Sequence, residues 1–486
     1  MVAMTGSPPV LDPAIGWAHL TAIVGLHVME DLLTYDEEYA IIPQLAEDYY
    51  ANDDYTEWTF ELRQGIPFHN GQELTSRDVA ASFWRTMEVS PRASDFSSIE
   101  DIRLEGDHQL TLLLSKPEPV MPALIANPLA GVPVFPADVL DEVEEGEHIT
   151  VEQYIGTGPF RIDEWLPDEY LRLVRFEDYS PDTRLDGPTG LGGNRTAHLD
   201  EVELVPVPES GSRVAGIITG DYHWAQDLPK IEYYDLEGNP DVQTGMQKAQ
   251  WAPLVYFNTK EPPMDDVRMR RAVQAVFNHD EIMLAAAELE EFYRLCSSFF
   301  FQEQVWYCPV GEEMGLYDQR DPERARELAD EAGYNGEEMV FLATSDYEWM
   351  YRGAMVMTEQ LRKAGFNFDL QVYDWSTMIA MREEPWHLNT SGDTIPFDGS
   401  YLNYWHTEQD FLGHSNPRID DILDRGMQHT DFDTRYEIYC ELSRALYEEL
   451  PYIKLGDMHE LHAQTNDVQG FVPYWIPRFW NVWIEE

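Results

Sequence analysis

The chain has 486 residues, 43% of them hydrophobic, which suits a globular protein of two or three domains rather than a disordered chain. Its 90 acidic and 32 basic residues give a formal net charge of −58, and only six of the basic residues are lysines. This charge excludes nucleic-acid binding, which needs a basic patch. It predicts a halophilic, acidic protein, because at 1 M salt a Debye length of about 3 Å screens the repulsion. An ordinary acidic protein is the alternative.

The apolar runs are too short for a membrane span. None approaches the roughly 20 residues that cross a bilayer, and the most apolar stretch, 20–29, is interrupted by His27. The opening MVAMTGSPPV has neither the basic nor the apolar region of a signal peptide. We therefore expect either a cytoplasmic protein or the mature form of an exported one.

In the first part of the chain, apolar residues alternate with polar ones in Trp58–Leu62, which predicts a strand with one buried face. Thr75 and Asp78 have the spacing of a capping box and predict the start of a helix. The segment 102–114 holds two apolar runs around a Gly-Asp turn and predicts a hairpin.

Later elements have clear helix ends. Asp321 followed by proline predicts a helix start, and Gly333 predicts the end of that helix. A second helix is expected over 351–364, ending before Gly365, with an alternating strand over 366–372. Helices and strands alternate in this way throughout, which indicates an α/β fold.

The chain has three cysteines. Cys296 and Cys308 flank an aromatic segment, whereas Cys440 lies in a helical pattern, and the spacing fits no common zinc site. We expect a Cys296–Cys308 disulfide if the protein is exported, and buried free thiols otherwise.

Several segments, in collinear order over nearly the whole chain, resemble the peptide/nickel-type family 5 solute-binding proteins of ABC importers. They are SPPVLDP (7–13), EDLLTYDEEYAIIPQLAEDY (30–49), WTFELRQGIPFHNGQELTSRDVAASFWR (58–85), IGTGPFRIDEW (155–165), VPVPESGSRVAGIITGDYHWA (205–225), VYFNTKEPPMDDVRMRRAVQAVFNHDEI (255–282) and DPERARELADEAGYNG (321–336). Members usually begin with a further β-strand and a signal, and little or nothing of either precedes Ser7.

The resemblance implies an α/β, two-lobed periplasmic-binding-protein-like fold of class II, the large peptide-binding type, with an extra subdomain in the N-terminal lobe. Ligand is then expected between the lobes, with closure on binding. The expected boundaries are 1–253 plus 456–486 for lobe I, about 31–154 for its subdomain, 254–455 for lobe II, and 254–258 and 452–455 for the hinge strands.

The resemblance also indicates where ligand contacts belong. An aromatic plate is expected from Trp375, and Tyr347 and Trp349 lie in a neighbouring loop; the alternative is that they are core residues. Peptide-binding relatives place an aspartate for the peptide amino group near here, which corresponds to Asp393 or Asp398. From the first lobe we expect contacts from the SPPVLDP loop, at Pro9 and Val10.

The expected function is capture of a small solute and its delivery to the permease subunits of an ABC transporter. A di- or oligopeptide is the leading ligand, and an oligosaccharide or another small solute is the alternative. A secreted carboxylate-dependent hydrolase is the rival from another class, but the sequence contains no GxSxG or HExxH motif. We expect no catalysis, metal or cofactor, and a monomer that is periplasmic or lipid-anchored to the outer face of the cell membrane.

Overall fold

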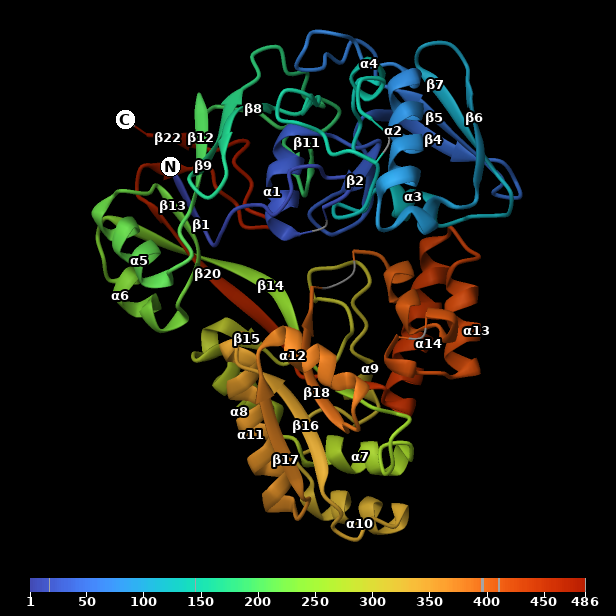
Figure 1. Ribbon diagram of the computed structural model, residues 1–486, viewed down its shortest axis with the longest axis vertical. Helices are drawn as coiled ribbons and strands as arrows, with labels where there is room; N and C mark the ends of the chain where they lie inside the picture. Colours follow the sequence, from blue (N-terminus) through green and yellow to red (C-terminus); the bar gives the residue numbers. More distant parts are fainter. Residues whose placement is uncertain (17, 145, 395–396, 410, 486) are drawn as a thin grey trace. The chain divides into compact units, whose positions relative to one another are not determined.

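The computed structural model describes residues 1–16, 18–144, 146–394, 397–409 and 411–485, which form two compact units (Figure 1). Unit 1 comprises Met1–Gln247 and Leu461–Glu486, and unit 2 comprises Lys248–Glu460. The chain passes from one unit to the other within two strands, β14 (Val242–Phe257) and β20 (Asp457–Thr465). The expected boundaries lie in or beside the same strands.

Unit 1 contains a sheet whose centre is the first strand of the chain. β1 (Val2–Met4) is fully buried and pairs in parallel with both β12 (Glu201–Pro206) and β13 (Trp224–Leu228). The sheet continues from β12 to β9 (Tyr170–Arg175) and β8 (Phe160–Leu166), and from β13 to β20. Little or nothing of a strand was expected before Ser7, and the structure has one of three residues there, which is too short to show a periodicity of its own.

A second sheet of unit 1 is antiparallel, in the order β4 (Ala46–Ala51), β5 (Glu57–Leu62), β7 (Gln109–Leu114) and β6 (Ile99–Leu104). Helix α2 (Ser76–Val89) packs against it (Figure 1). Trp58, Phe60 and Leu62 are all buried, and the capping box at the start of α2 is formed. Strand, hairpin and helix start are thus confirmed.

The other elements of unit 1 are short. They are α1 (His19–Val28), β2 (Leu33–Tyr35), β3 (Ile41–Pro43), α3 (Met121–Ile125), α4 (Ala137–Leu140), β10 (Pro188–Thr189), β11 (Gly192–Gly193), α5 (Ser210–Thr219), α6 (Tyr233–Glu237), β21 (Val468–Gln469) and β22 (Trp483–Ile484).

Unit 2 is built on three mutually parallel strands in the order β17 (Phe368–Tyr373), β16 (Met339–Thr344), β18 (Leu388–Asp393), with β18 antiparallel to β14. β19 (Tyr452–Lys454) also pairs with β14, and β15 (Tyr293–Arg294) pairs with β20. The helices are α7 (Val267–Val276), α8 (His279–Ala287), α9 (Val310–Glu313), α10 (Pro322–Ala332), α11 (Glu348–Ala364), α12 (Trp375–Ala380), α13 (Pro417–Gly426) and α14 (Phe432–Glu449).

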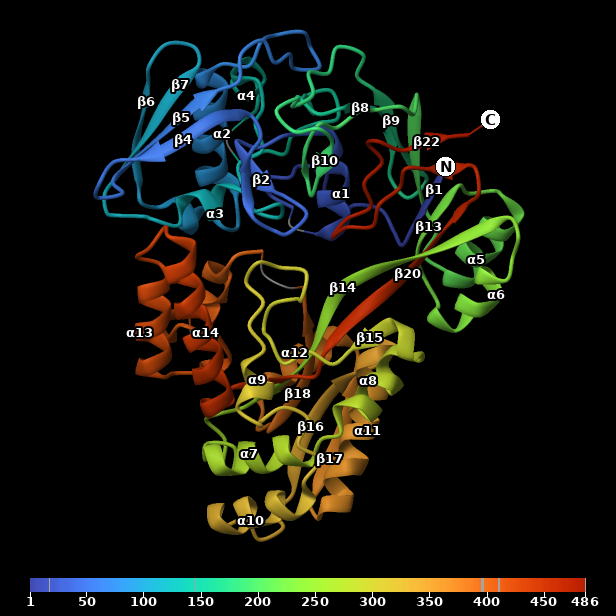
Figure 2. The same ribbon diagram turned by 180° about the vertical axis from the view of Figure 1, so that it is seen from behind.

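Helix α11 lies alongside α8 and packs on β16 and β17 (Figure 2). The expected helix ends are confirmed: Asp321 caps α10, and Gly333 and Gly365 end α10 and α11 in the left-handed conformation, where glycine avoids a Cβ clash.

The disulfide of the structure joins Cys308 to Cys440, with their Cα atoms 5.9 Å apart. The predicted Cys296–Cys308 pair is therefore wrong. Cys440 lies on the buried face of α14, in the same apolar cluster as Cys308. The Cys296 sulfur is free and buried, with Lys454 Nζ 3.7 Å away. Closeness in sequence therefore does not decide which thiols pair here, because packing in the apolar cluster brings Cys308 to Cys440, 132 residues away.

Candidate ligand-binding sites

The aspartate Asp393 is the last residue of β18, opposite Ala252 of β14. The phenol of Tyr256, also on β14, donates a hydrogen bond to its Oδ2 at 3.1 Å. Burial raises the pKa of Asp393, and the Tyr256 hydrogen bond and the positive charge of Arg382 offset part of that rise. A half-buried carboxylate at a strand end is thus held in place by one phenol.

Trp349 lies against Gly392, the residue that precedes this aspartate in β18. A Cβ on Gly392 would come within 2.4 Å of the indole Cη2, so the close approach of Trp349 to the strand requires glycine at this position. Trp349 is half-buried in the first turn of α11. The structure therefore packs Trp349 against β18 at Gly392, the residue that precedes Asp393.

A second aromatic pair follows the neighbouring strands. Tyr347 and Trp375 pack edge to face, with ring centroids 5.4 Å apart and planes at 89°. Tyr347 is 43% exposed, whereas Trp375 is half-buried at the start of α12. The Trp375 backbone N–H donates to Asp346 Oδ2 at 2.9 Å, which ties the two loops together.

All four side chains lie at or just after the carboxyl ends of β16, β17 and β18. Because these strands run parallel, their carboxyl ends share one edge of the sheet. Open α/β sheets characteristically bind ligands at this edge.

Asp398 has a different place. It is buried at 1% exposure, caps the 3₁₀ segment Gly399–Trp405 and accepts two hydrogen bonds from Arg435, at 2.6 and 3.0 Å. The nearby Arg435 guanidinium holds the pKa of this carboxyl below its usual range despite the opposing effect of burial. Its carboxylate is occupied by a structural partner, unlike that of Asp393.

In unit 1, the SPPVLDP loop exposes Pro9, while Val10 is half-buried. The Val10 carbonyl accepts a hydrogen bond from Thr21 Oγ1 at 2.6 Å, which fastens the loop to α1. Asp12 is buried, paired with Arg85, and accepts from the Ile149 N–H at 3.1 Å. The loop is thus anchored at Val10 and Asp12 while Pro9 remains exposed.

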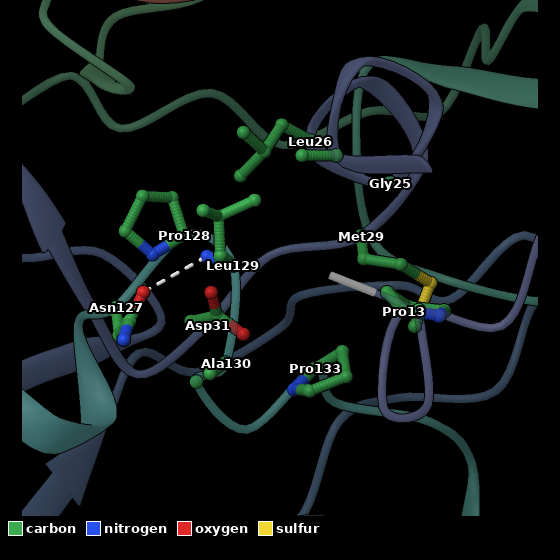
Figure 3. Close-up of a pocket in the computed structure, with 13 residues that line it drawn as sticks. Pro13, Gly25, Leu26, Met29, Asp31, Asn127, Pro128, Leu129, Ala130 and Pro133 are labelled. Atoms are coloured by element: carbon green, nitrogen blue, oxygen red, sulfur yellow. Dashed lines mark hydrogen bonds between the residues drawn. The ribbon is translucent and has the colours of Figure 1, made fainter. Parts of the chain in front are cut away.

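Unit 1 also contains a pocket that was not expected from the sequence (Figure 3). It holds about 370 Å³ of empty space, including space open to solvent. Its lining residues are Pro13, Gly16, Ala22, Gly25, Leu26, Met29, Asp31, Asn127, Pro128, Leu129, Ala130, Gly131 and Pro133. Asp31 is the one ionisable residue among them. The available sequence signal was the acidic pair Glu30-Asp31, which stands between the apolar stretch 20–29 and Leu32-Leu33.

The histidines of the HELH motif lie on β20, where burial lowers the pKa of both His459 and His462 to about 4. Within the described residues, no group of three or more His, Cys, Asp or Glu side chains is placed to hold a metal ion. Over the same residues, no helix has the length and apolar character needed to span a membrane.

The chain is similar over nearly its whole length to known binding proteins of transporters. A probable peptide ABC transporter periplasmic-binding protein of Sinorhizobium fredii is 24% identical, covering 97% of this chain and 91% of the relative. The glutathione-binding protein GsiB of Escherichia coli K12 is 22% identical, covering 98% and 91%.

Among solved structures, the periplasmic binding protein DppA from Helicobacter pylori, in complex with the peptide STSA, superposes with a TM-score of 0.78 at 22% identity. That match covers 100% of this chain and 98% of the other, and it shows the shared two-lobed fold. Residues 40–411 match the family described as bacterial extracellular solute-binding proteins, family 5 (middle). Since the match spans most of the sequence, the chain belongs to the family 5 extracellular solute-binding proteins.

Proposed function

We propose that this protein is the extracytoplasmic solute-binding component of an ABC importer and that its ligand is a short peptide. The observation that carries the proposal is Asp393, a half-buried carboxylate at a strand end that accepts a hydrogen bond from the Tyr256 phenol. A carboxylate placed in this way suits the α-ammonium group of a peptide. The names of the relatives support a peptide ligand, because one is a probable peptide transporter component and another binds glutathione.

In unit 2, the proposed contacts are Asp393 for the ammonium group and Trp349, Tyr347 and Trp375 for apolar side chains or the peptide plane. Asp398 is expected to stabilise the fold through its ion pair with Arg435 and not to contact the ligand. In unit 1, we place contacts on Pro9 and Val10. The protein would release the ligand unchanged to permease subunits, as a monomer in the periplasm or anchored to the outer face of the membrane.

The test begins with native mass spectrometry of the purified protein, to identify any ligand that co-purifies. Calorimetric titration with di-, tri- and tetrapeptides should then give one-to-one binding, weakened by N-acetylation of the peptide. The Asp393→Asn protein should lose affinity, whereas the Glu61→Gln protein, changed at an exposed residue of β5, should not. Tight binding of an oligosaccharide instead, or turnover of the ligand, would overturn the proposal.

A further inference from the structure

The pocket of unit 1 places one of two adjacent carboxylates in an unusual environment. Both carboxylate oxygens of Glu30 have partners. Arg195 forms an ion pair with Glu30, Tyr179 donates to its Oε1 at 3.1 Å, and Thr157 donates to its Oε2 at 2.8 Å. The carboxylate of Asp31 accepts no hydrogen bond and forms no ion pair with any residue in the described part of the chain. Arg195, whose positive charge acts on Asp31, forms its ion pair with Glu30.

The walls around Asp31 are apolar. Leu26, Met29 and Pro13 come from α1 and the segments flanking it, and Pro128 and Leu129 come from the loop opposite (Figure 3). Within that loop, the Asn127 Oδ1 accepts a hydrogen bond from the Leu129 N–H at 3.0 Å (Figure 3).

The loop passes next to the Asp31 carboxylate at Gly131. A Cβ on Gly131 would lie 2.4 Å from the Ile125 carbonyl oxygen and 3.5 Å from Asp31 Oδ2. Glycine at this position therefore keeps space open next to the carboxylate.

We propose that this pocket binds a primary ammonium group at the end of an aliphatic chain, with Asp31 as its counter-ion. The ligand class is a solute that carries a lysine-like amine, so the inference rests on the proposed function and narrows it. One carboxylate without further oxygen or nitrogen ligands suits an ammonium group, whereas a divalent metal needs several ligands. The apolar walls suit the methylene stem.

The ionisation of Asp31 supports the pairing. Burial and, to a smaller extent, the negative charge of Glu30 raise the pKa of Asp31, the positive charge of Arg195 opposes them, and the net result is a pKa of about 8. The other lining residues that the structure describes carry no titratable side chain. An alkylammonium stays charged up to about pH 10. It should therefore bind by displacing the Asp31 proton, and its affinity should rise up to tenfold per pH unit below about pH 8 and level off above.

The probes are pentan-1-amine, which is an ammonium ion at neutral pH, and pentan-1-ol as its uncharged counterpart. Calorimetry of the full chain at pH 7, in two buffers with different ionisation enthalpies, counts the protons released. We expect pentylammonium to bind with release of most of one proton and at least tenfold more tightly than pentanol. The Asp31→Asn protein should lose at least tenfold in affinity, and the Glu61→Gln control should lose none.

Carbon-13 NMR of aspartate carboxyls gives a second readout that needs only the parent protein. A carboxyl that titrates near pH 8 should shift its titration by one pH unit or more on saturation with pentylammonium.

Binding without proton release, or pentanol binding as tightly as pentylammonium, would overturn the proposal. If no peptide binds but pentylammonium still displaces the proton, the proposed peptide function fails while the pocket assignment stands. If Ala-Lys-Ala binds no better than Ala-norleucine-Ala, and pentylammonium does not bind, the pocket assignment fails alone.

Discussion

Arg435 holds Asp398 with two parallel hydrogen bonds, from Nη1 to Oδ2 at 3.0 Å and from Nη2 to Oδ1 at 2.6 Å, in a buried part of unit 2. Five residues earlier, Asp393 receives a phenol and lies half-buried at a strand end. Two aspartates that look equivalent in the sequence therefore have separate tasks, one in stability and one in the proposed binding.

Replacement of Asp398 by asparagine should destabilise the protein, because it leaves the buried charge of Arg435 uncompensated. Breaking one side of a buried ion pair costs about 3–5 kcal/mol. Urea unfolding followed by circular dichroism measures the change. The matched control is Asp393→Asn, which should cost less than about 1 kcal/mol of stability; equal losses in the two proteins would contradict the division of tasks.

The same Asp393→Asn protein should bind peptide about 10- to 100-fold more weakly, since a charge-assisted hydrogen bond to an ammonium group contributes about 1.5–3 kcal/mol. Calorimetry with one tripeptide and its N-acetylated form checks this. If both forms bind the variant and the parent equally, Asp393 is not the amine partner.

Replacement of Trp375 by alanine should weaken ligand binding by about 1–3 kcal/mol if the indole contacts ligand. The half-buried ring also packs on the core of unit 2, so thermal unfolding is measured on the same sample. Tyr347→Ala serves as the companion variant, because Tyr347 is more exposed and contacts the Trp375 ring. A folded Trp375→Ala protein with parental affinity would remove Trp375 from the site.

Tandem mass spectrometry of protein alkylated without reductant should find Cys308 linked to Cys440 and Cys296 labelled only after unfolding. The closed loop has a sequence separation of 132 residues, and loss of a native disulfide typically costs about 2–5 kcal/mol. The Cys440→Ser protein should show that loss, whereas Cys296→Ser should not. A peptide joining Cys296 to Cys308 would contradict the structure.

Asp31 should make stability fall as pH rises. Its pKa of about 8 in the folded protein lies above the unfolded value near 4, so between these pH values the folded state binds more protons than the unfolded one. The stabilisation from protonated Asp31 is fully present below about pH 4 and is lost by about pH 8. Asp31→Asn should therefore gain stability relative to the parent across this range, by on the order of 1–3 kcal/mol at pH 8. The thermal midpoints of the parent and of Asp31→Asn, measured at pH 5 and pH 8, test this prediction. If the difference between the two proteins were the same at both pH values, the pKa of Asp31 would not be raised in the folded protein.

The charge of −58 predicts that thermal midpoints climb substantially between about 0.1 M and about 3 M KCl, because salt screens the repulsion between charges farther apart than the Debye length, which shrinks from about 10 Å at 0.1 M to about 3 Å at 1 M. Several chloride salts should be compared to separate screening from binding of a particular cation. A flat profile would show that the acidic surface does not limit stability.

Features that depend on a few adjacent residues were predictable from the sequence. The capping box of Thr75 and Asp78, the ends of α10 at Asp321 and Gly333, and the buried face of Trp58–Leu62 each follow from local backbone geometry or period. The motifs in collinear order likewise identified the family, because together they span nearly the whole chain.

The tertiary structure alone decided which polar groups are free and which thiols meet. Arg435, which occupies Asp398, is 37 residues away in sequence, and Cys440 is 132 residues from Cys308. Asp31 and Glu30 are neighbours in the chain, yet only Glu30 meets Arg195, which is 165 residues away. Burial and partner choice arise from packing between distant segments, so local patterns carry no information about them, and the proposed sites depend on those partners.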